Sequence, residues 1–170
     1  MAFHHSHILA SAKAKRWLMQ TVTPPMSAFC TIYLVALITR EFLPVSQSPV
    51  LAASMGASAV ILFINPNSQY SSPWSLIGGH LVSSLVGISC AISIPDTVLS
   101  AAAAVGGSML IMQLLRCMNP PGAATALAPL MSPTHADSLH YYLLLSTVMV
   151  NAILLVLLSA FINRLLRLIG

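Results

Sequence analysis

Charged residues are scarce in this chain of 170 residues. Lysine and arginine number seven and aspartate and glutamate three, so that 6% of the residues are charged and 57% are hydrophobic. The mean hydropathy is +0.87, whereas soluble globular domains carry roughly a quarter charged residues. The composition excludes an ordinary soluble domain. It predicts an all-α integral membrane protein, because apolar stretches of about 18 residues recur and each can cross a hydrocarbon core of ~30 Å as a helix.

Catalytic and metal-binding patterns are also missing. The three acidic residues are scattered, and no Gly-x-Ser-x-Gly, His-Glu-x-x-His or P-loop pattern occurs, so we expect neither an enzyme nor an ATP-driven pump. Cys30, Cys90 and Cys117 are isolated and lack metal-ligand spacing, which predicts no disulfide framework, no metal site and no cofactor. The net charge of +4 is spread along the chain, so no nucleic-acid partner is expected.

Four apolar segments are predicted to be full transmembrane helices, over 26–43, 74–94, 97–112 and 140–162. Two shorter stretches are interrupted by proline and predict broken or re-entrant helices; alternatively, all six segments cross. In both arrangements the flanking basic residues place the N- and C-termini in the cytoplasm. We therefore expect a basic cytoplasmic arm over 1–25 without a removable signal peptide, one transmembrane domain over 26–163 and a basic cytoplasmic tail over 164–170.

The two broken stretches resemble each other at an offset of 66 residues. "GASAVILF" begins at Gly56 and "GAATALAP" at Gly122, and each follows a Ser-Pro or Asn-Pro-Pro break. This predicts an internal two-fold repeat, with units at 26–94 and 97–163 that each read helix, broken short helix, helix. Paired broken segments in corresponding halves are typical of a transporter with a substrate site near the bilayer midplane.

The stretch "RCMNPPGAATALAPL", residues 116–130, predicts the start of a helix. Pro120 and Pro121 are best tolerated in a first turn, Asn119 is a capping residue, and Gly122 with Ala123 allows close approach. A helix N-terminus attracts anions, and Arg116 would add a planar cationic group beside it. Alternatively, the motif is an ordinary loop and this arginine is a topology charge. The corresponding stretch in the first half shows the same helix-start pattern more weakly, with Gly56 permitting close packing.

Three further features of the apolar segments need a role. His80 is ionisable within a predicted span, which favours anion or proton binding; alternatively, it only hydrogen-bonds a neighbouring helix. Small residues at four-residue intervals, Gly79 and Gly87 among them, predict close helix packing. Asn151 either joins helices or lines a pathway.

Three motifs in this order, "GASAVILF", "SSPWSLIGGHLVSSLVG" and "RCMNPPGAATAL", resemble those of the HPP family of small bacterial and plastid membrane proteins, which is named for a His-Pro-Pro motif. The resemblance covers about 42–131. Residues that match the family motifs include Gly56, Ser58, His80, Arg116, Pro120, Pro121 and Gly122. The naming histidine is Asn119 here, which retains hydrogen bonding but cannot titrate near neutral pH.

The resemblance implies a four-span membrane protein with a transport role, and some cyanobacterial and chloroplast members are associated with nitrite transport. We therefore expect a secondary transporter or channel for a small monovalent oxyanion, multi-pass in the cell inner membrane or a plastid membrane. Its expected partners are the anion and the lipid bilayer, and the chain is expected to act as a monomer or a homo-oligomer. The alternative is a non-transporting membrane scaffold or sensor component.

Overall fold

The computed structural model describes residues 17, 20–42, 49–131 and 138–169, and within them it is all-helical. The helices are α2 (Thr23–Phe42), α3 (Pro49–Ile64), α4 (Pro73–Ser93), α5 (Thr97–Leu114), α6 (Pro120–Thr125) and α7 (Ser138–Ile169), with a short 3₁₀ turn, η2 (Gln69–Ser71), before α4. The predicted all-α class is confirmed. Lys13, Lys15 and Arg16 of the predicted basic arm lie outside the described residues.

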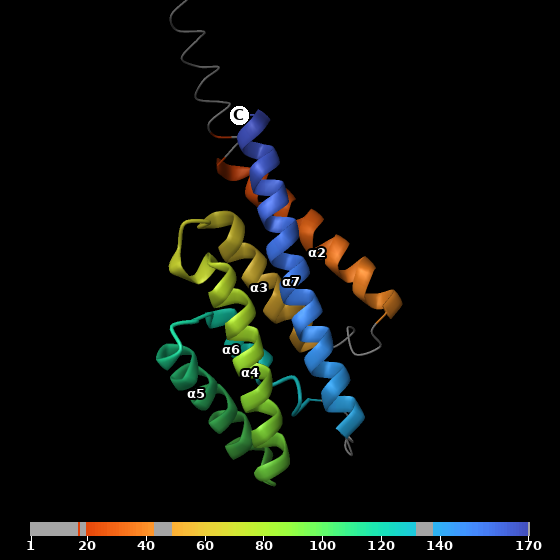
Figure 1. Ribbon diagram of the computed structural model, residues 1–170, viewed down its shortest axis with the longest axis vertical. Coiled ribbons are helices and arrows are strands. Elements are labelled where there is room, and N and C mark those ends of the chain that lie inside the picture. Colours follow the sequence, from red (N-terminus) through yellow and green to blue (C-terminus); the bar gives the residue numbers. More distant parts are fainter. Residues whose placement is uncertain (1–16, 18–19, 43–48, 132–137, 170) are drawn as a thin grey trace, which may run out of the picture.

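Local sequence signals explain where the two central helices begin. The Ser72 hydroxyl accepts from the N–H of Ser75, and Pro73 occupies the first turn of α4, where a missing N–H costs nothing. A carboxylate oxygen of Asp96 accepts from the N–H of Leu99 at 2.7 Å, which caps α5. Residues 94–96 are therefore enough to reverse the chain, and α4 and α5 form an antiparallel pair (Figure 1).

Chain direction alternates through the bundle. In Figure 1, α2 and α4 run downward, whereas α3, α5 and α7 run upward. Because α5 ends toward the upper side and α7 begins at the lower side, the stretch that contains α6 leads the chain back between them. The order helix, short helix, helix therefore occurs twice, as α2–α3–α4 and α5–α6–α7, which is the order that the predicted repeat requires.

Among the described residues, three helices are long and apolar enough to cross a membrane: Pro73–Ser93, Thr97–Leu114 and Leu139–Leu168. The predicted first span is the 20-residue α2, which falls outside this set although it has the length. Helix α7 continues to Ile169, beyond the predicted end at 162. Arg164 and Arg167 therefore lie on the last turns of α7, where the sequence predicted a separate tail.

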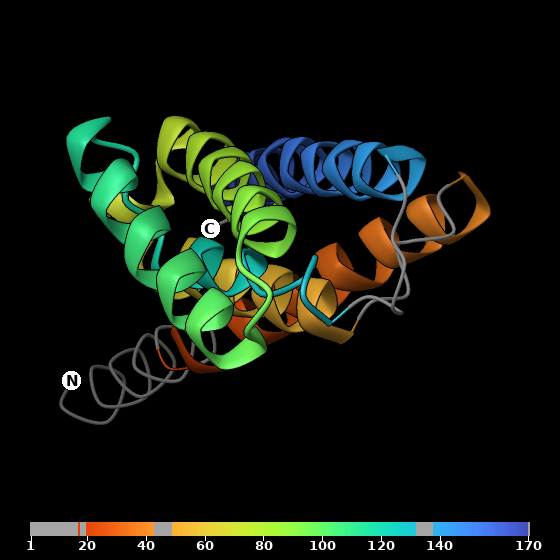
Figure 2. The same cartoon turned by 90° about the horizontal axis from the view of Figure 1, so that it is seen from below.

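The core lies where α3, α4 and α7 meet. Its buried side chains come mainly from α3 and α7, and the Ala128 side chain from the turns after α6 packs into the same cluster. In Figure 2 the short α6 lies inside the bundle, with α3, α4 and α5 around it, and each of these three helices contacts α6. The interruption in the second unit is therefore enclosed by protein, as irregular backbone within a membrane requires.

The small-residue face of α4 provides room for this interruption. A Cβ atom added to Gly87 would stand 2.8 Å from the carbonyl carbon of Ala126, and one added to Gly79 would stand 2.5 Å from the Cβ of Asn119. Real Cβ atoms do not approach other heavy atoms this closely, so both positions require glycine. The predicted close packing of this face is confirmed, and its partner is the stretch of residues 117–126.

Candidate functional site

A cluster of buried polar side chains joins α3, α4 and α6. We call Ser54, Ser58, His80 and Thr125 the polar junction. Each is at most 1% exposed. Hydrogen bonds connect them in a row: Ser58 Oγ lies 3.1 Å from His80 Nε2, His80 Nδ1 lies 2.9 Å from Thr125 Oγ1, and Thr125 Oγ1 lies 2.7 Å from Ser54 Oγ. Ser54 Oγ also donates to the carbonyl oxygen of Pro121 at 2.7 Å.

The carbonyl at one end fixes the direction of the hydrogen bonds from Pro121 as far as His80 Nδ1. A carbonyl oxygen only accepts, so the single proton of the Ser54 hydroxyl points to Pro121. Thr125 must then donate to Ser54, which leaves the Thr125 oxygen to accept from Nδ1–H of His80.

In the neutral form of the imidazole, the proton is therefore on Nδ1 and Nε2 accepts. Ser58 donates to that nitrogen. The polar junction contains no carboxylate, so no side-chain anion competes for its donors.

Asn119 lies next to the junction and carries a polar group without a partner. The residue is 1% exposed, and its side-chain Nδ2 has no hydrogen-bond partner in the described part of the chain. Gly122 lies close to this amide, since a Cβ atom there would stand 3.0 Å from Nδ2. A buried amide N–H of this kind is costly unless a ligand or water accepts its proton.

The start of α6 differs from the predicted anion cradle. Asn119 occupies the N-cap position, as the sequence predicted, but its side chain makes no capping hydrogen bond. Pro120 and Pro121 have no N–H, and the N–H of Ala123 is bonded to the carbonyl oxygen of Asn119. Of the first-turn donors only that of Gly122 remains. The same prolines that start the helix remove most of the N–H groups that an anion would need.

Arg116 ends α5 in a conformation that favours glycine. Its φ of 55° lies in the left-handed region. The N–H of Cys117 donates to the carbonyl of Met112 at 2.9 Å, and that of Arg116 donates to the carbonyl of Gln113 at 3.2 Å. This pattern is a Schellman motif, whose left-handed position is usually glycine. An arginine costs on the order of 1 kcal/mol there.

The turn after Arg116 presses against α4. Cys117 is fully buried, and its Cβ stands 3.0 Å from where a Cβ of Gly78 would lie. Burial raises the pKa of the Cys117 thiol. Gly78 and Gly79 together let residues 117–119 lie directly on α4.

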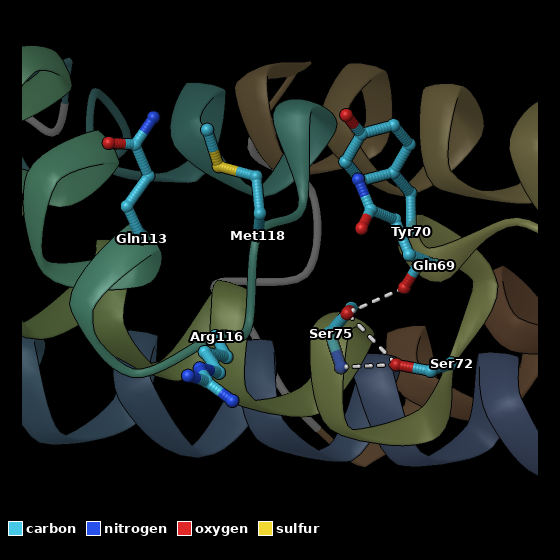
Figure 3. Close-up of a pocket in the computed structure, with 7 residues that line it drawn as sticks. All are labelled: Gln69, Tyr70, Ser72, Ser75, Gln113, Arg116 and Met118. Carbon is cyan, nitrogen blue, oxygen red and sulfur yellow. Dashed lines mark hydrogen bonds between the residues drawn. The ribbon is translucent and has the colours of Figure 1, made fainter.

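The Arg116 side chain lines a surface pocket with a volume of about 540 Å³. Figure 3 shows Gln113, Arg116 and Met118 on the α5 side of this pocket and Gln69, Tyr70, Ser72 and Ser75 on the side formed by η2 and the start of α4. A hydrogen bond from Trp74 Nε1 to the carbonyl of Leu115, 3.2 Å long, joins the two sides. We call this the arginine pocket.

The predicted site residues therefore fall into two groups. His80, Ser58 and Asn119 lie at or beside the polar junction, together with the start of α6 at Pro120, Pro121, Gly122 and Ala123. Arg116 is exposed and lines the arginine pocket, in which neither His80 nor Asn119 takes part. His80 and Arg116 therefore lie at different sites. The hydrogen bonds of His80 are those of the packing alternative, to Ser58 and Thr125.

Gly56 does not have the predicted packing role. No atom of the described residues lies within 4 Å of where its Cβ would stand, so it permits no close approach. Asn151 is 5% exposed, and its side-chain oxygen has no partner among the described residues, so the predicted joining of helices is not seen at that atom. His135 and Asp137 lie outside the described residues.

Sequence reasoning missed Ser54 and Thr125. The available signal was the spacing: Ser54 and Ser58 are four residues apart and share one face of a helix, as do Pro121 and Thr125. A serine within an apolar helix commonly bonds its own backbone, so this spacing alone does not reveal an interhelical partner.

Comparisons with known proteins agree with the membrane architecture. A transmembrane protein of Dictyostelium discoideum is 39% identical over 107 residues, which cover 60% of this chain and 37% of that protein. A second transmembrane protein of the same organism is 31% identical over 122 residues, covering 69% of this chain and 39% of the relative. The chain thus spans about two fifths of the length of these curated relatives. No solved structure matches it significantly.

One family model matches nearly the whole chain. Its description is "HPP, transmembrane region", and it covers residues 13–168. The match includes helices α2 to α6 in full and all but the last residue of α7. The three motifs and the family model therefore agree, and the chain belongs to the HPP transmembrane family.

Proposed function

We propose that this chain is a secondary transporter or channel for a small monovalent oxyanion, with nitrite as the candidate that the family suggests. Membership of a transmembrane family and three helices able to cross a membrane are consistent with a transporter or channel. The observation that carries the proposal is the unpartnered, 1% exposed amide of Asn119 beside an acid-free polar junction, at the point where the second unit is interrupted.

The start of α6 supplies the groups that would hold the ion. Asn119 Nδ2 and the N–H of Gly122 are both donors, and donors are what an oxyanion requires. The N-terminal end of α6 adds a partial positive charge of the helix, although six residues make this contribution small. The ion is thus bound at a buried half-helix N-terminus, through fewer backbone donors than a start without proline would offer.

His80 lies one residue from Gly79, against which Asn119 packs. Its Nδ1–H is already given to Thr125, and its Nε2 accepts from Ser58, so the neutral ring has no proton left for an anion. A proton arriving at Nε2 would only require the Ser58 hydroxyl to rotate, and the resulting cation would attract the ion. His80 is therefore the proton partner in the proposal, and Asn119 is the direct ligand.

The test is nitrite flux in proteoliposomes that contain the full chain. Asn119→Leu keeps the number and branching of the side-chain heavy atoms and removes the donor, so it should reduce nitrite flux at least tenfold at equal protein density. Thr147→Val is the matched control, because Thr147 is equally buried and its hydroxyl bonds only the carbonyl of Leu143 on its own helix. Its flux should equal that of the parent.

Asn119→His restores the motif for which the family is named. Histidine titrates near neutral pH, so nitrite flux in this variant should depend more steeply on pH between 5 and 8 than flux in the parent. Equal flux in Asn119→Leu and the parent would remove the proposed binding site. The absence of nitrite flux in every protein tested would favour the scaffold or sensor alternative.

A further inference from the structure

The arginine pocket is too large for the ion of the proposed function. Its volume of about 540 Å³ is in the range of pockets that hold organic ligands, roughly 300–1,000 Å³, whereas a single water takes up about 30 Å³ in the liquid. A three-atom anion such as nitrite would touch one wall and leave the rest to water. The pocket is therefore a separate site with a larger occupant.

The charge of the pocket selects an anionic ligand. Arg116 is the one charged residue among the seven that line it, and no carboxylate is among them. A guanidinium presents planar paired donors that match the oxygens of a phosphate or carboxylate. The backbone cost of an arginine at the left-handed position agrees with a requirement for this side chain, since glycine would close the Schellman motif at less cost.

Two serines of the opposite wall present acceptors for a hydroxyl group. The proton of Ser72 Oγ goes to Ser75 Oγ at 2.9 Å, and that of Ser75 Oγ goes to the carbonyl of Gln69 at 2.8 Å, as the dashed lines in Figure 3 show. Both serine protons are thus used within the wall, and what remains toward the pocket are oxygen lone pairs. These accept from a hydroxyl and repel a bare oxyanion.

We propose that the arginine pocket binds a hydroxylated organic phosphate, with the phosphate on Arg116 and a hydroxyl on the Ser72–Ser75 wall. Two sources carry this chemistry: the glycerol-phosphate head group of an anionic lipid and a soluble phosphate monoester. Exposed apolar side chains next to the lining residues along the chain, Trp74, Leu114 and Leu115, offer a surface for the acyl chains of a lipid. The site does not depend on the transport proposal, because its test measures binding rather than flux.

The full chain in neutral detergent is tested with two probes. One arm adds phosphatidylglycerol, with phosphatidylethanolamine as its comparison; the other adds glycerol 3-phosphate, with glycerol plus inorganic phosphate as its comparison. Bound probe is counted by native mass spectrometry, and the thermal midpoint is followed in parallel. The parent should bind one equivalent of at least one hydroxylated phosphate and gain several degrees in midpoint, whereas the comparison compounds should produce neither effect. Saturation by phosphatidylglycerol alone identifies the lipid source.

Two variants remove the binding in different ways. Arg116→Asn deletes the charge and keeps a residue that tolerates the left-handed conformation. Gln113→Glu places a carboxylate in the pocket at an exposed position, so folding should not suffer. Each should weaken binding at least tenfold, while Arg164→Asn, at an exposed arginine of α7, should bind as the parent does. Parent protein that binds neither probe, or variants that bind as tightly as the parent, would overturn the proposal.

Discussion

Helices α3 and α6 occupy corresponding places in the two units, yet one is continuous and the other is interrupted. Each begins at a proline, but α3 runs for 16 residues and α6 for six. After Thr125 the chain continues in turns closed by bonds between residues three apart, such as Ala128 N–H to the carbonyl of Thr125. Pro129 explains the stop, because a residue before proline is disfavoured in the α conformation and proline itself donates no bond.

The difference shows that the polar junction is not a symmetric feature of the repeat. At the offset of 66 residues, Thr125 corresponds to the buried Ala59, and His80 corresponds to Ser146, whose hydroxyl bonds only the carbonyl of Leu143 on its own helix. Helix α3 supplies two hydroxyls on one face, those of Ser54 and Ser58. Helix α6 supplies the hydroxyl of Thr125 and the carbonyl of Pro121. The order helix, short helix, helix is thus common to both units, whereas the residues that form the junction are not.

The contact between α4 and the interrupted stretch gives the largest expected effect. Gly87→Leu would force a side chain into the backbone of Ala126, which should cost roughly 3 kcal/mol of stability and most of the folded yield in detergent. Gly56→Leu is the matched control in the continuous helix, where nothing described lies within 4 Å; we expect it to stabilise by up to about 1 kcal/mol, because glycine disfavours a helix interior. Equal losses in both variants would show that the two units do not differ in packing.

The next largest effect is expected when hydrogen bonds between different helices are lost, as compared with a hydrogen bond within one helix. Thr125→Val keeps the shape of the side chain but leaves His80 Nδ1–H without an acceptor and removes the donor to Ser54 Oγ, which should cost about 1–3 kcal/mol of unfolding free energy in denaturant titration. Thr147→Val removes only a bond within α7 and should cost less. The derived bond directions fail if nitrogen NMR of the parent finds the His80 proton on Nε2.

A smaller effect is expected at the other end of the row. Ser58→Ala removes the donor to His80 Nε2 and leaves one buried acceptor unpaired, which should cost about 1 kcal/mol. Ser89→Ala serves as the control, because Ser89 is exposed and bonds the carbonyl of Leu85 on α4. Thermal midpoints of the two variants measured side by side test this order, and a greater loss in Ser89→Ala contradicts it.

The smallest expected effect concerns the turn that leads the chain into the interrupted helix. Arg116→Gly relieves the left-handed strain at a φ of 55° and should stabilise the protein by about 0.5–1 kcal/mol in the same detergent titration. The control is Arg164→Gly within α7, which should destabilise by about 1 kcal/mol because glycine disfavours the helix interior. A loss of stability at Arg116 as well would mean that its side chain contributes more than the strain costs.

The sequence by itself determined the membrane class, the all-helical fold, the family and most helix starts. These features follow from local rules. A long apolar run in a membrane must form its backbone hydrogen bonds within a helix. Capping residues and first-turn prolines mark helix starts, as they do at Ser72–Pro73, Asp96 and Asn119–Pro120. The close-packed face of α4 could also be predicted, because small residues at four-residue intervals lie on one side of a helix.

Only the tertiary structure decided which polar groups meet. Ser54 and Thr125 are 71 residues apart, and their hydrogen bond depends on how α6 is inserted beside α3. Arg116 and Asn119 are neighbours in sequence, and the natural expectation was a shared anion site. The left-handed turn at Arg116 instead carries its side chain to the surface pocket, while Asn119 is buried against Gly79. The turn that separates the two sites has a φ of 55° at Arg116. No composition or spacing rule specifies such an angle for a residue other than glycine.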